Sequence, residues 1–200
     1  MTKLKTSTQN PVTAHYARSY FDRLSTLFKD INPAQVETVG ELLFQARAED
    51  RYVFIIGNGG SAASASHLAV DFGKGCSRGR EKRFKVISLT DNTPWITAIA
   101  NDISYDEIFS EQLINFAHAG DLVIAISASG NSKNVIRALE VANQMNCVTI
   151  GISGFKGGKI KALVKHHIHI PSEHMGMIED GQMTVGHILL YGFMDAEGCG

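Results

Sequence analysis

The chain has 200 residues, a formal net charge of −1 and 44% hydrophobic residues. This length and composition describe a globular chain that can bury one sizeable core, so we expect a single domain over residues 1–200. The near-neutral charge argues against a nucleic-acid-binding or membrane-surface protein, and no run approaches the roughly 18 apolar residues of a membrane span. The three cysteines lack CxxC spacing, which fits a reducing compartment, and we expect a cytoplasmic protein.

The N-terminal quarter predicts a tail and two helices. Residues 1–12 are polar and are expected to form a loose tail. Over residues 13–31 apolar side chains recur at three- and four-residue steps, which is the period of an amphipathic helix. A second helix over residues 33–48 starts after Asn32, a plausible N-cap. We expect this region, residues 13–50, to dock on the rest of the fold or on another subunit.

Residues 51–200 alternate short apolar runs with helical segments. Nearly continuous apolar runs are typical of strands that are covered on both faces in a parallel sheet. Their alternation with helices predicts a doubly wound α/β fold, with a mostly parallel five-stranded sheet flanked by helices. The strands are expected over residues 52–56, 84–89, 121–127, 147–153 and 167–171, and two of the helices over residues 133–143 and 176–195.

Two loops that follow predicted strands have the chemistry of a phosphate site. In a parallel sheet, ligands bind at the carboxyl ends of the strands, where loops lead into helices. The loop 57-GNGGS-61 combines glycines with two polar side chains, and the loop 127-SASGNS-132 supplies three hydroxyls ahead of a helix. Either loop alone also fits an ordinary strand-to-helix turn. Neither matches the P-loop or the dinucleotide pattern, so we expect no nucleotide cofactor.

These two loops and the stretch 101-NDISYDEIFSEQL-113 together resemble the SIS (sugar isomerase) domain family, and within it the phosphoheptose isomerases. The resemblance covers essentially the whole chain and implies a site for a phosphorylated sugar. It implies that the hydroxyls of the second loop hold the phosphate and that the first loop lines the sugar. Two polar residues after strand 84–89 are expected to contact sugar hydroxyls. The implied residues are Ser127, Ser129 and Ser132 for the phosphate, and Asn58, Gly59, Gly60, Ser61, Asp91 and Asn92 for the sugar.

Ketose–aldose isomerisation needs a base at the carbon beside the carbonyl and a partner that moves a second proton. His67 and Asp71 are four residues apart and share one helix face, while Glu179 and His187 are eight apart, about two turns. Phosphoheptose isomerases carry His, Glu, Gln and His at the matching positions. The resemblance implies catalytic roles for Asp71 and His187 and a substrate contact for Glu179. It also implies a zinc site of His67, Asp71, Glu179 and His187.

Two of these positions depart from the family pattern. Asp71 stands in place of Glu and pulls its carboxylate back by about 1.5 Å, and a shift of about 1 Å can cost on the order of a hundredfold in rate. The backbone would have to compensate. Glu179 stands in place of Gln, and its added negative charge favours a divalent metal. If both carboxylates bind metal, the adjacent Asp180 is the alternative base, although it points about 100° away.

Four histidines gather near the last predicted strand: His166, His167, His169 and His174. They fit either a metal site or a packed or solvent-facing group, and strand alternation puts His167 and His169 on one face. Lys156 and Lys159 could add positive charge near a strand end, or could be solvated loop lysines.

The leading hypothesis is an aldose–ketose isomerase that converts sedoheptulose 7-phosphate to D-glycero-D-manno-heptose 7-phosphate through an enediol. One alternative is a non-catalytic SIS module that binds a sugar phosphate or serves as a protein-binding scaffold, as in relatives that associate with the replication initiator. Another is an isomerase or lyase for a different phosphorylated sugar. The resemblance also implies a homotetramer whose sites gather residues from more than one subunit.

Overall fold

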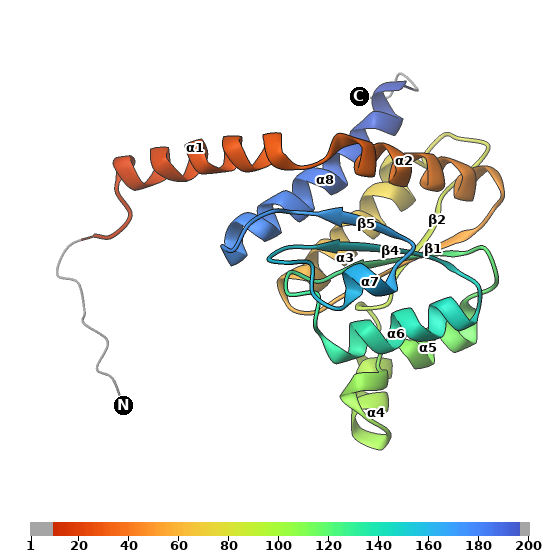
Figure 1. Cartoon of the computed structure of the whole chain (residues 1–200). Helices are drawn as coiled ribbons and strands as arrows, with labels where there is room; N and C mark the ends of the chain where they lie inside the picture. Colours follow the sequence, from red (N-terminus) through yellow and green to blue (C-terminus); the bar gives the residue numbers. More distant parts are fainter. Residues whose placement is uncertain (1–9, 197–200) are drawn as a thin grey trace.

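The structure is a computed structural model that describes residues 10–196. Its five strands form one all-parallel sheet in the order β2-β1-β3-β4-β5, which confirms the predicted doubly wound α/β fold (Figure 1). The predicted ranges of the five strands differ from the observed ones by one or two residues at their ends. The strands are β1 (Tyr52–Gly57), β2 (Lys85–Ser88), β3 (Leu122–Ile126), β4 (Val148–Ser153) and β5 (His166–His169).

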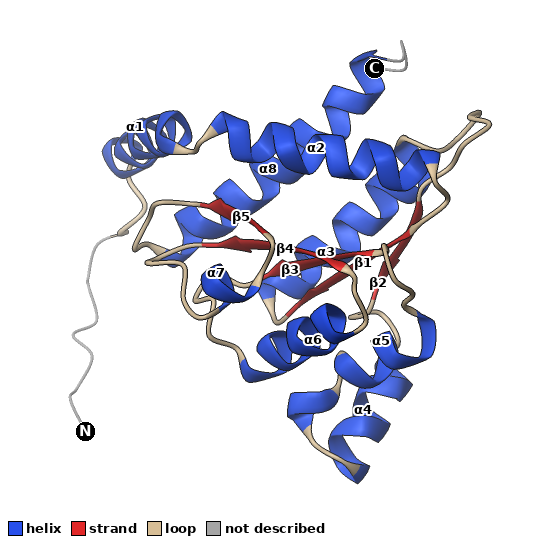
Figure 2. Cartoon of the chain, turned by 45° about the vertical axis from the view of Figure 1, so that its right-hand side comes forward, coloured by secondary structure: helices blue, strands red, loops and turns tan. Residues whose placement is uncertain are grey.

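Helices cover both faces of the sheet. On one face lie α2, α3 and α8, and on the other lie α4, α5, α6 and α7 (Figure 2). Residues 1–9, most of the expected N-terminal tail, fall outside the described range. The helices are α1 (Ala14–Asp30), α2 (Pro33–Ala48), α3 (Gly60–Val70), the π-helix η1 (Asp71–Gly75), α4 (Thr93–Asp102), the 3-10 helix η2 (Tyr105–Glu107), α5 (Ser110–Phe116), α6 (Lys133–Gln144), α7 (Ile160–Leu163) and α8 (Met175–Ala196).

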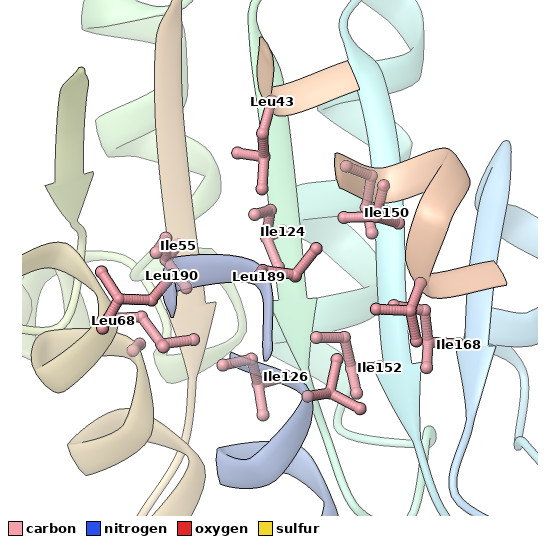
Figure 3. Close-up of a cluster of buried hydrophobic side chains, with 14 of the residues drawn as sticks. Leu43, Ile55, Leu68, Ile124, Ile126, Ile150, Ile152, Ile168, Leu189 and Leu190 are labelled. Carbon is pink, nitrogen blue, oxygen red and sulfur yellow. The ribbon is translucent and has the colours of Figure 1, made fainter. Parts of the chain in front are cut away.

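The central strands are buried on both faces, and β3 is buried at every position. Alternate side chains such as Ile124 and Ile150 pack under Leu43 of α2 and Leu189 of α8 (Figure 3). The intervening side chains, Val123 among them, pack against the helices of the opposite face. This double coverage is the reason why the strands read as nearly continuous apolar runs.

The two N-terminal helices behave differently. α2 lies over the sheet and contacts β5, β1 and α8. α1 begins after Thr13, whose Oγ1 accepts a hydrogen bond from the Tyr16 backbone N–H, and it projects beyond the sheet (Figure 1). Leu27 is its single buried residue, and Phe21 is 61% exposed. Within this chain, only α2 therefore docks on the sheet as expected.

An apolar groove of about 990 Å³, here called the α2–α8 groove, runs between these two helices. Its lining includes Phe28, Val36, Phe44, Ile188 and Phe193. Among residues 10–196, no helix combines the length and apolar character needed to cross a membrane.

Candidate active site

The turn between β1 and α3 is shaped by glycines that serve different purposes. Gly59 has a φ of +55°, a conformation that favours glycine. Gly60 is the first residue of α3, and a Cβ there would lie 2.5 Å from Oε1 of Glu179 on α8. A side chain at either position would strain the turn or displace Glu179, so this turn and α8 can approach closely only with glycine here.

A pocket of about 250 Å³ lies where the two predicted loops meet. The loops come together because they follow β1 and β3, which are neighbours in the sheet. Glu179 reaches the same pocket from α8. The lining consists of Asn58, Ser61, Ile126, Ser127, Ala128, Ser129, Ser132, Met175 and Glu179. We call this space the serine pocket, and residues 127–132 the serine loop.

The serine loop leaves hydroxyl protons available to a ligand. Ser127 Oγ accepts from the Gly130 backbone N–H at 3.2 Å, and Ser129 Oγ accepts from the Asn131 backbone N–H at 3.2 Å. Neither hydroxyl donates to another group among residues 10–196, so each O–H is available to a ligand. Ser132 precedes α6 and makes no side-chain cap there. Hydroxyl donors at the positive end of a helix suit an anion such as phosphate.

Two residues that sequence reasoning did not assign orient Asn58. Asn58 Nδ2 donates to Asn134 Oδ1 at 2.8 Å, and Asn134 Nδ2 donates to Asn58 Oδ1 at 2.9 Å. Tyr105 Oη also donates to Asn58 Oδ1, at 3.2 Å. The one available signal was that Tyr105 belongs to the stretch that carries the family resemblance. The network fixes the orientation of the Asn58 amide at the pocket wall.

Asp91 and Asn92 lie away from the serine pocket. They line a different pocket, of about 630 Å³, beside the edge strand β2. Asn92 caps α4 by accepting from the Trp95 backbone N–H at 3.2 Å, and Asp91 accepts from the Ser66 hydroxyl. The separation follows from the strand order, because β2 and β3 lie on opposite sides of β1.

His67 on α3 and Asp71, the first residue of η1, meet His187 on α8. His67 Nε2 lies 3.1 Å from Asp71 Oδ2 and 3.2 Å from His187 Nε2, and His187 Nε2 lies 4.0 Å from Asp71 Oδ2. The two histidine side chains are 50% and 45% exposed, and that of Asp71 is 24% exposed. These three residues, here called the trio, therefore meet within one chain at an open surface.

The helix changes its geometry at Asp71. The π-helix η1 starts there, and the Cys76 backbone N–H donates to the Asp71 carbonyl five residues earlier, at 3.1 Å. Single π-turns of this kind are frequent at functional sites. The backbone is thus wider at the position where the side chain is one methylene shorter than in the family pattern.

The trio fits a divalent metal. Tetrahedral zinc with bonds near 2.1 Å separates its ligand atoms by about 3.4 Å, close to the spacings within the trio. Two imidazoles and one carboxylate form a known catalytic zinc donor set that leaves a fourth position open. Among residues 10–196, the trio is the one group of three or more His, Cys, Asp or Glu side chains close enough to share an ion.

Glu179 and Asp180 both lie apart from the trio. Glu179 lines the serine pocket, two helical turns before His187. Asp180 Oδ2 accepts from Tyr20 Oη of α1 at 2.7 Å, and Asp180 is not part of the pocket lining. The structure therefore brings together three of the four expected metal ligands. Asp180, the alternative base, is hydrogen-bonded to α1 instead.

Three of the histidines near β5, His167, His169 and His174, contact neighbouring side chains. His167 Nε2 lies 2.8 Å from Ser153 Oγ, and its ring stacks on that of His169 with centroids 5.9 Å apart. Burial, with a smaller contribution from neighbouring charge, lowers the pKa of His167 to about 4. His174 lies edge-on to the Tyr20 ring. Of the two alternatives for this group, the packed arrangement is the one seen.

Comparisons with known proteins agree with this geometry. The SIS domain model matches residues 15–154. The chain is 42% identical to the phosphoheptose isomerase of Trichlorobacter lovleyi, over 82% of this chain and 87% of the relative. It is 37% identical to that of Geotalea daltonii, over 83% and 85%.

Among solved structures, phosphoheptose isomerase GmhA from Neisseria gonorrhoeae superposes with a TM-score of 0.81 at 32% identity, covering 91% of this chain and 96% of that one. The residues matched by the family model include both loops, His67 and Asp71. The chain therefore belongs to the SIS domain family and, within it, to the phosphoheptose isomerases.

Proposed function

We infer that the protein is an aldose–ketose isomerase that converts sedoheptulose 7-phosphate to D-glycero-D-manno-heptose 7-phosphate through an enediol. The observation that carries this inference is the pairing of two sites on the same two helices. α3 and α8 each supply residues to the serine pocket and, further along, to the trio. His67 follows Ser61 by six residues, a rise of about 9 Å along α3. An elongated sugar phosphate has an anionic end and a carbonyl end, which suit two such sites.

At the anionic end, the serine loop is proposed to bind the phosphate. Ser127, Ser129 and Ser132 would donate their hydroxyl protons, and the N-terminus of α6 would add its positive end. Asn58 and Glu179, which both line the pocket, would hold sugar hydroxyls. Neutral donors suit a substrate that must leave again, because they bind a phosphate without a full opposite charge.

At the carbonyl end, Asp71 is proposed as the base and His187 as its acid–base partner. Asp71 Oδ2 faces both imidazoles, while Oδ1 makes no hydrogen bond to another residue of the described range, so one oxygen remains for the substrate proton. Asp71 would take the proton from the carbon beside the carbonyl, and His187 would give a proton to the carbonyl oxygen. Asp71 would then return its proton to the former carbonyl carbon, and His187 would take the hydroxyl proton from the first carbon, which leaves the aldehyde and restores both groups.

A zinc ion is proposed at the trio. His67, Asp71 and His187 would hold it, and a bound zinc ion would polarise the carbonyl as a Lewis acid in place of the proton that His187 would give in the metal-free site. The support is the spacing of the three ligand atoms and the absence, among residues 10–196, of another such group. Glu179 remains a proposed substrate contact, and it would join the ion only through a change of rotamer or backbone.

We also propose that the active protein is a cytoplasmic homotetramer. The trio is half-exposed, and reacting groups of this kind are normally shielded from water. The projecting α1, with Phe21 at 61% exposure, and the apolar α2–α8 groove offer surfaces that another copy could bury. In such an assembly a second subunit would complete the open side of the trio.

The proposed function is tested by His187→Ala. Loss of the acid–base partner should lower kcat for sedoheptulose 7-phosphate by about 10²- to 10⁴-fold, the usual contribution of such a group. His118→Ala is the control, because that side chain is 79% exposed, lies near Asp121 and belongs to neither the serine pocket nor the trio. A His187→Ala protein that keeps more than about a tenth of wild-type kcat contradicts the assignment.

A further inference from the structure

The loop between β4 and α7, residues 154–159, is hydrogen-bonded to the serine loop. Three backbone N–H groups donate across this boundary: Gly154 to the Ala128 carbonyl at 2.9 Å, Ile160 to the Gly130 carbonyl at 3.1 Å, and Lys159 to Asn131 Oδ1 at 3.1 Å. The positions of the serine hydroxyls therefore depend on where the β4–α7 loop lies.

The two loops touch backbone to backbone. Gly130, Gly157 and Gly158 have positive φ values of +63°, +93° and +59°. A Cβ on Gly130 would overlap the Gly157 carbonyl, and a Cβ on Gly158 would overlap the Ser129 carbonyl. Because no side chain separates the loops at these glycines, a displacement of Gly157 is passed directly to the serine loop.

His167 holds Gly157 through a buried serine. Ser153 Oγ donates to the Gly157 carbonyl at 3.1 Å, and His167 Nε2 lies 2.8 Å from the same Oγ. A serine hydroxyl has one proton, so His167 Nε2 carries the N–H and donates to Ser153. Ser153 is fully buried. The lowered pKa of His167 agrees with a neutral imidazole that has one donor in this direction.

His169 restrains the same loop at a second point. Its Nε2 lies 2.8 Å from the Phe155 carbonyl, and its backbone N–H donates to Gln35 Oε1 of α2 at 3.3 Å. Phe155 has a φ of +47°, which is unfavourable for a residue with a side chain and needs external support. The loop is thus fixed from β5 on both sides of Lys156.

We propose that His167 is a positioning residue for phosphate binding. Through Ser153 and Gly157 it holds the serine loop in the geometry that a phosphate needs, although it does not line the serine pocket. The proposal rests on the proposed function, which places the phosphate at the serine loop. Because His167 acts on the phosphate end and not on the trio, it should affect substrate binding and leave the chemical step unchanged.

The test compares His167→Ala and His167→Gln with His166→Ala. Gln can present an N–H at a reach similar to that of imidazole Nε2, and His166 is the adjacent residue of β5, on the opposite face. We expect His167→Ala to raise both KM for sedoheptulose 7-phosphate and the inhibition constant of inorganic phosphate about tenfold, with kcat within twofold. His167→Gln should recover to within about threefold of wild type, and His166→Ala should match wild type.

Unchanged KM and phosphate inhibition in folded His167→Ala would overturn the proposal, as would a loss confined to kcat. If His167→Ala does not fold, Ser153→Ala breaks the same relay and must show the same KM effect. If wild type binds the sugar phosphate without turning it over, the proposed function fails, and the dissociation constant from calorimetry decides the role of His167. A tenfold weakening in His167→Ala then supports it, and an unchanged constant rejects it.

Discussion

Asp71 combines a short side chain with a change of helix type. The sequence posed the question of how the carboxylate could reach its partners with one methylene fewer. In the structure α3 passes into a π-turn at this residue, and Asp71 Oδ2 lies 3.1 Å from His67 Nε2. The spacing of four residues predicted the His67–Asp71 pair, but the approach of His187 from α8 depended on tertiary packing.

Removing this carboxylate should weaken metal binding. With one of three ligands gone, we expect Asp71→Ala to lower zinc affinity by at least about a hundredfold, beyond the 10- to 100-fold effect of outer-shell changes. Competition with a chromogenic chelator measures it, and Asp91→Ala, at the other pocket, is the matched control. Zinc affinity within threefold of wild type in Asp71→Ala would reject the proposed site.

His167 should make stability depend on pH. Burial, with smaller effects from His169 and Lys161, lowers its folded-state pKa to about 4, below the ordinary value of 6.5. The folded state then binds fewer protons than the unfolded state between these values. The free energy of unfolding should therefore fall as the pH falls from about 6.5 to about 4.

His167→Gln removes this titrating group. Urea unfolding at pH 7 and pH 4.5 should show a smaller loss of stability on acidification in His167→Gln than in wild type. Equal losses in the two proteins would mean that His167 does not titrate as described.

At the level of secondary structure, the sequence predicted the features that depend on local residue patterns. Buried strands such as β3 appear as apolar runs, and the two loops follow them as expected. The sequence predicted Asp91 and Asn92 beside the sugar, but they line a different pocket, because their distance from the serine pocket depends on strand order, a property of the whole sheet. The resemblance also grouped Glu179 with the trio. In the structure it lies apart, because the eight residues between Glu179 and His187 span about 12 Å of helix.

The contact between α1 and α8 rests on few side chains. Tyr20 Oη donates to Asp180, and this hydrogen bond, with burial, raises the pKa of Tyr20 to about 12. Tyr20→Phe should release the N-terminal part of α1 at a cost of about 1 kcal/mol, or about fivefold faster amide exchange in α1. Tyr16→Phe on the same helix is the control. Equal exchange in the two variants would show that Asp180 does not fasten α1.

At the scale of the whole molecule, the open trio and the exposed apolar surfaces have one explanation in common, which is assembly. Light scattering coupled to size-exclusion chromatography should give the mass of four chains. Phe44 is 60% exposed and lines the α2–α8 groove, so Phe44→Asp should shift the protein to smaller species. Ile114→Asp, on α5 and 54% exposed, should leave the mass unchanged. A monomeric wild type would contradict the tetramer.

The central claim is that this chain exchanges the carbonyl position of a heptose phosphate. Proton NMR of sedoheptulose 7-phosphate with the purified protein in D₂O tests it directly, with zinc present and after chelation. The account predicts new anomeric signals of the aldose phosphate, with deuterium at carbon 2 to the extent that the transferred proton exchanges with solvent. A spectrum that stays that of the ketose phosphate in both conditions, while the protein is folded, would contradict it.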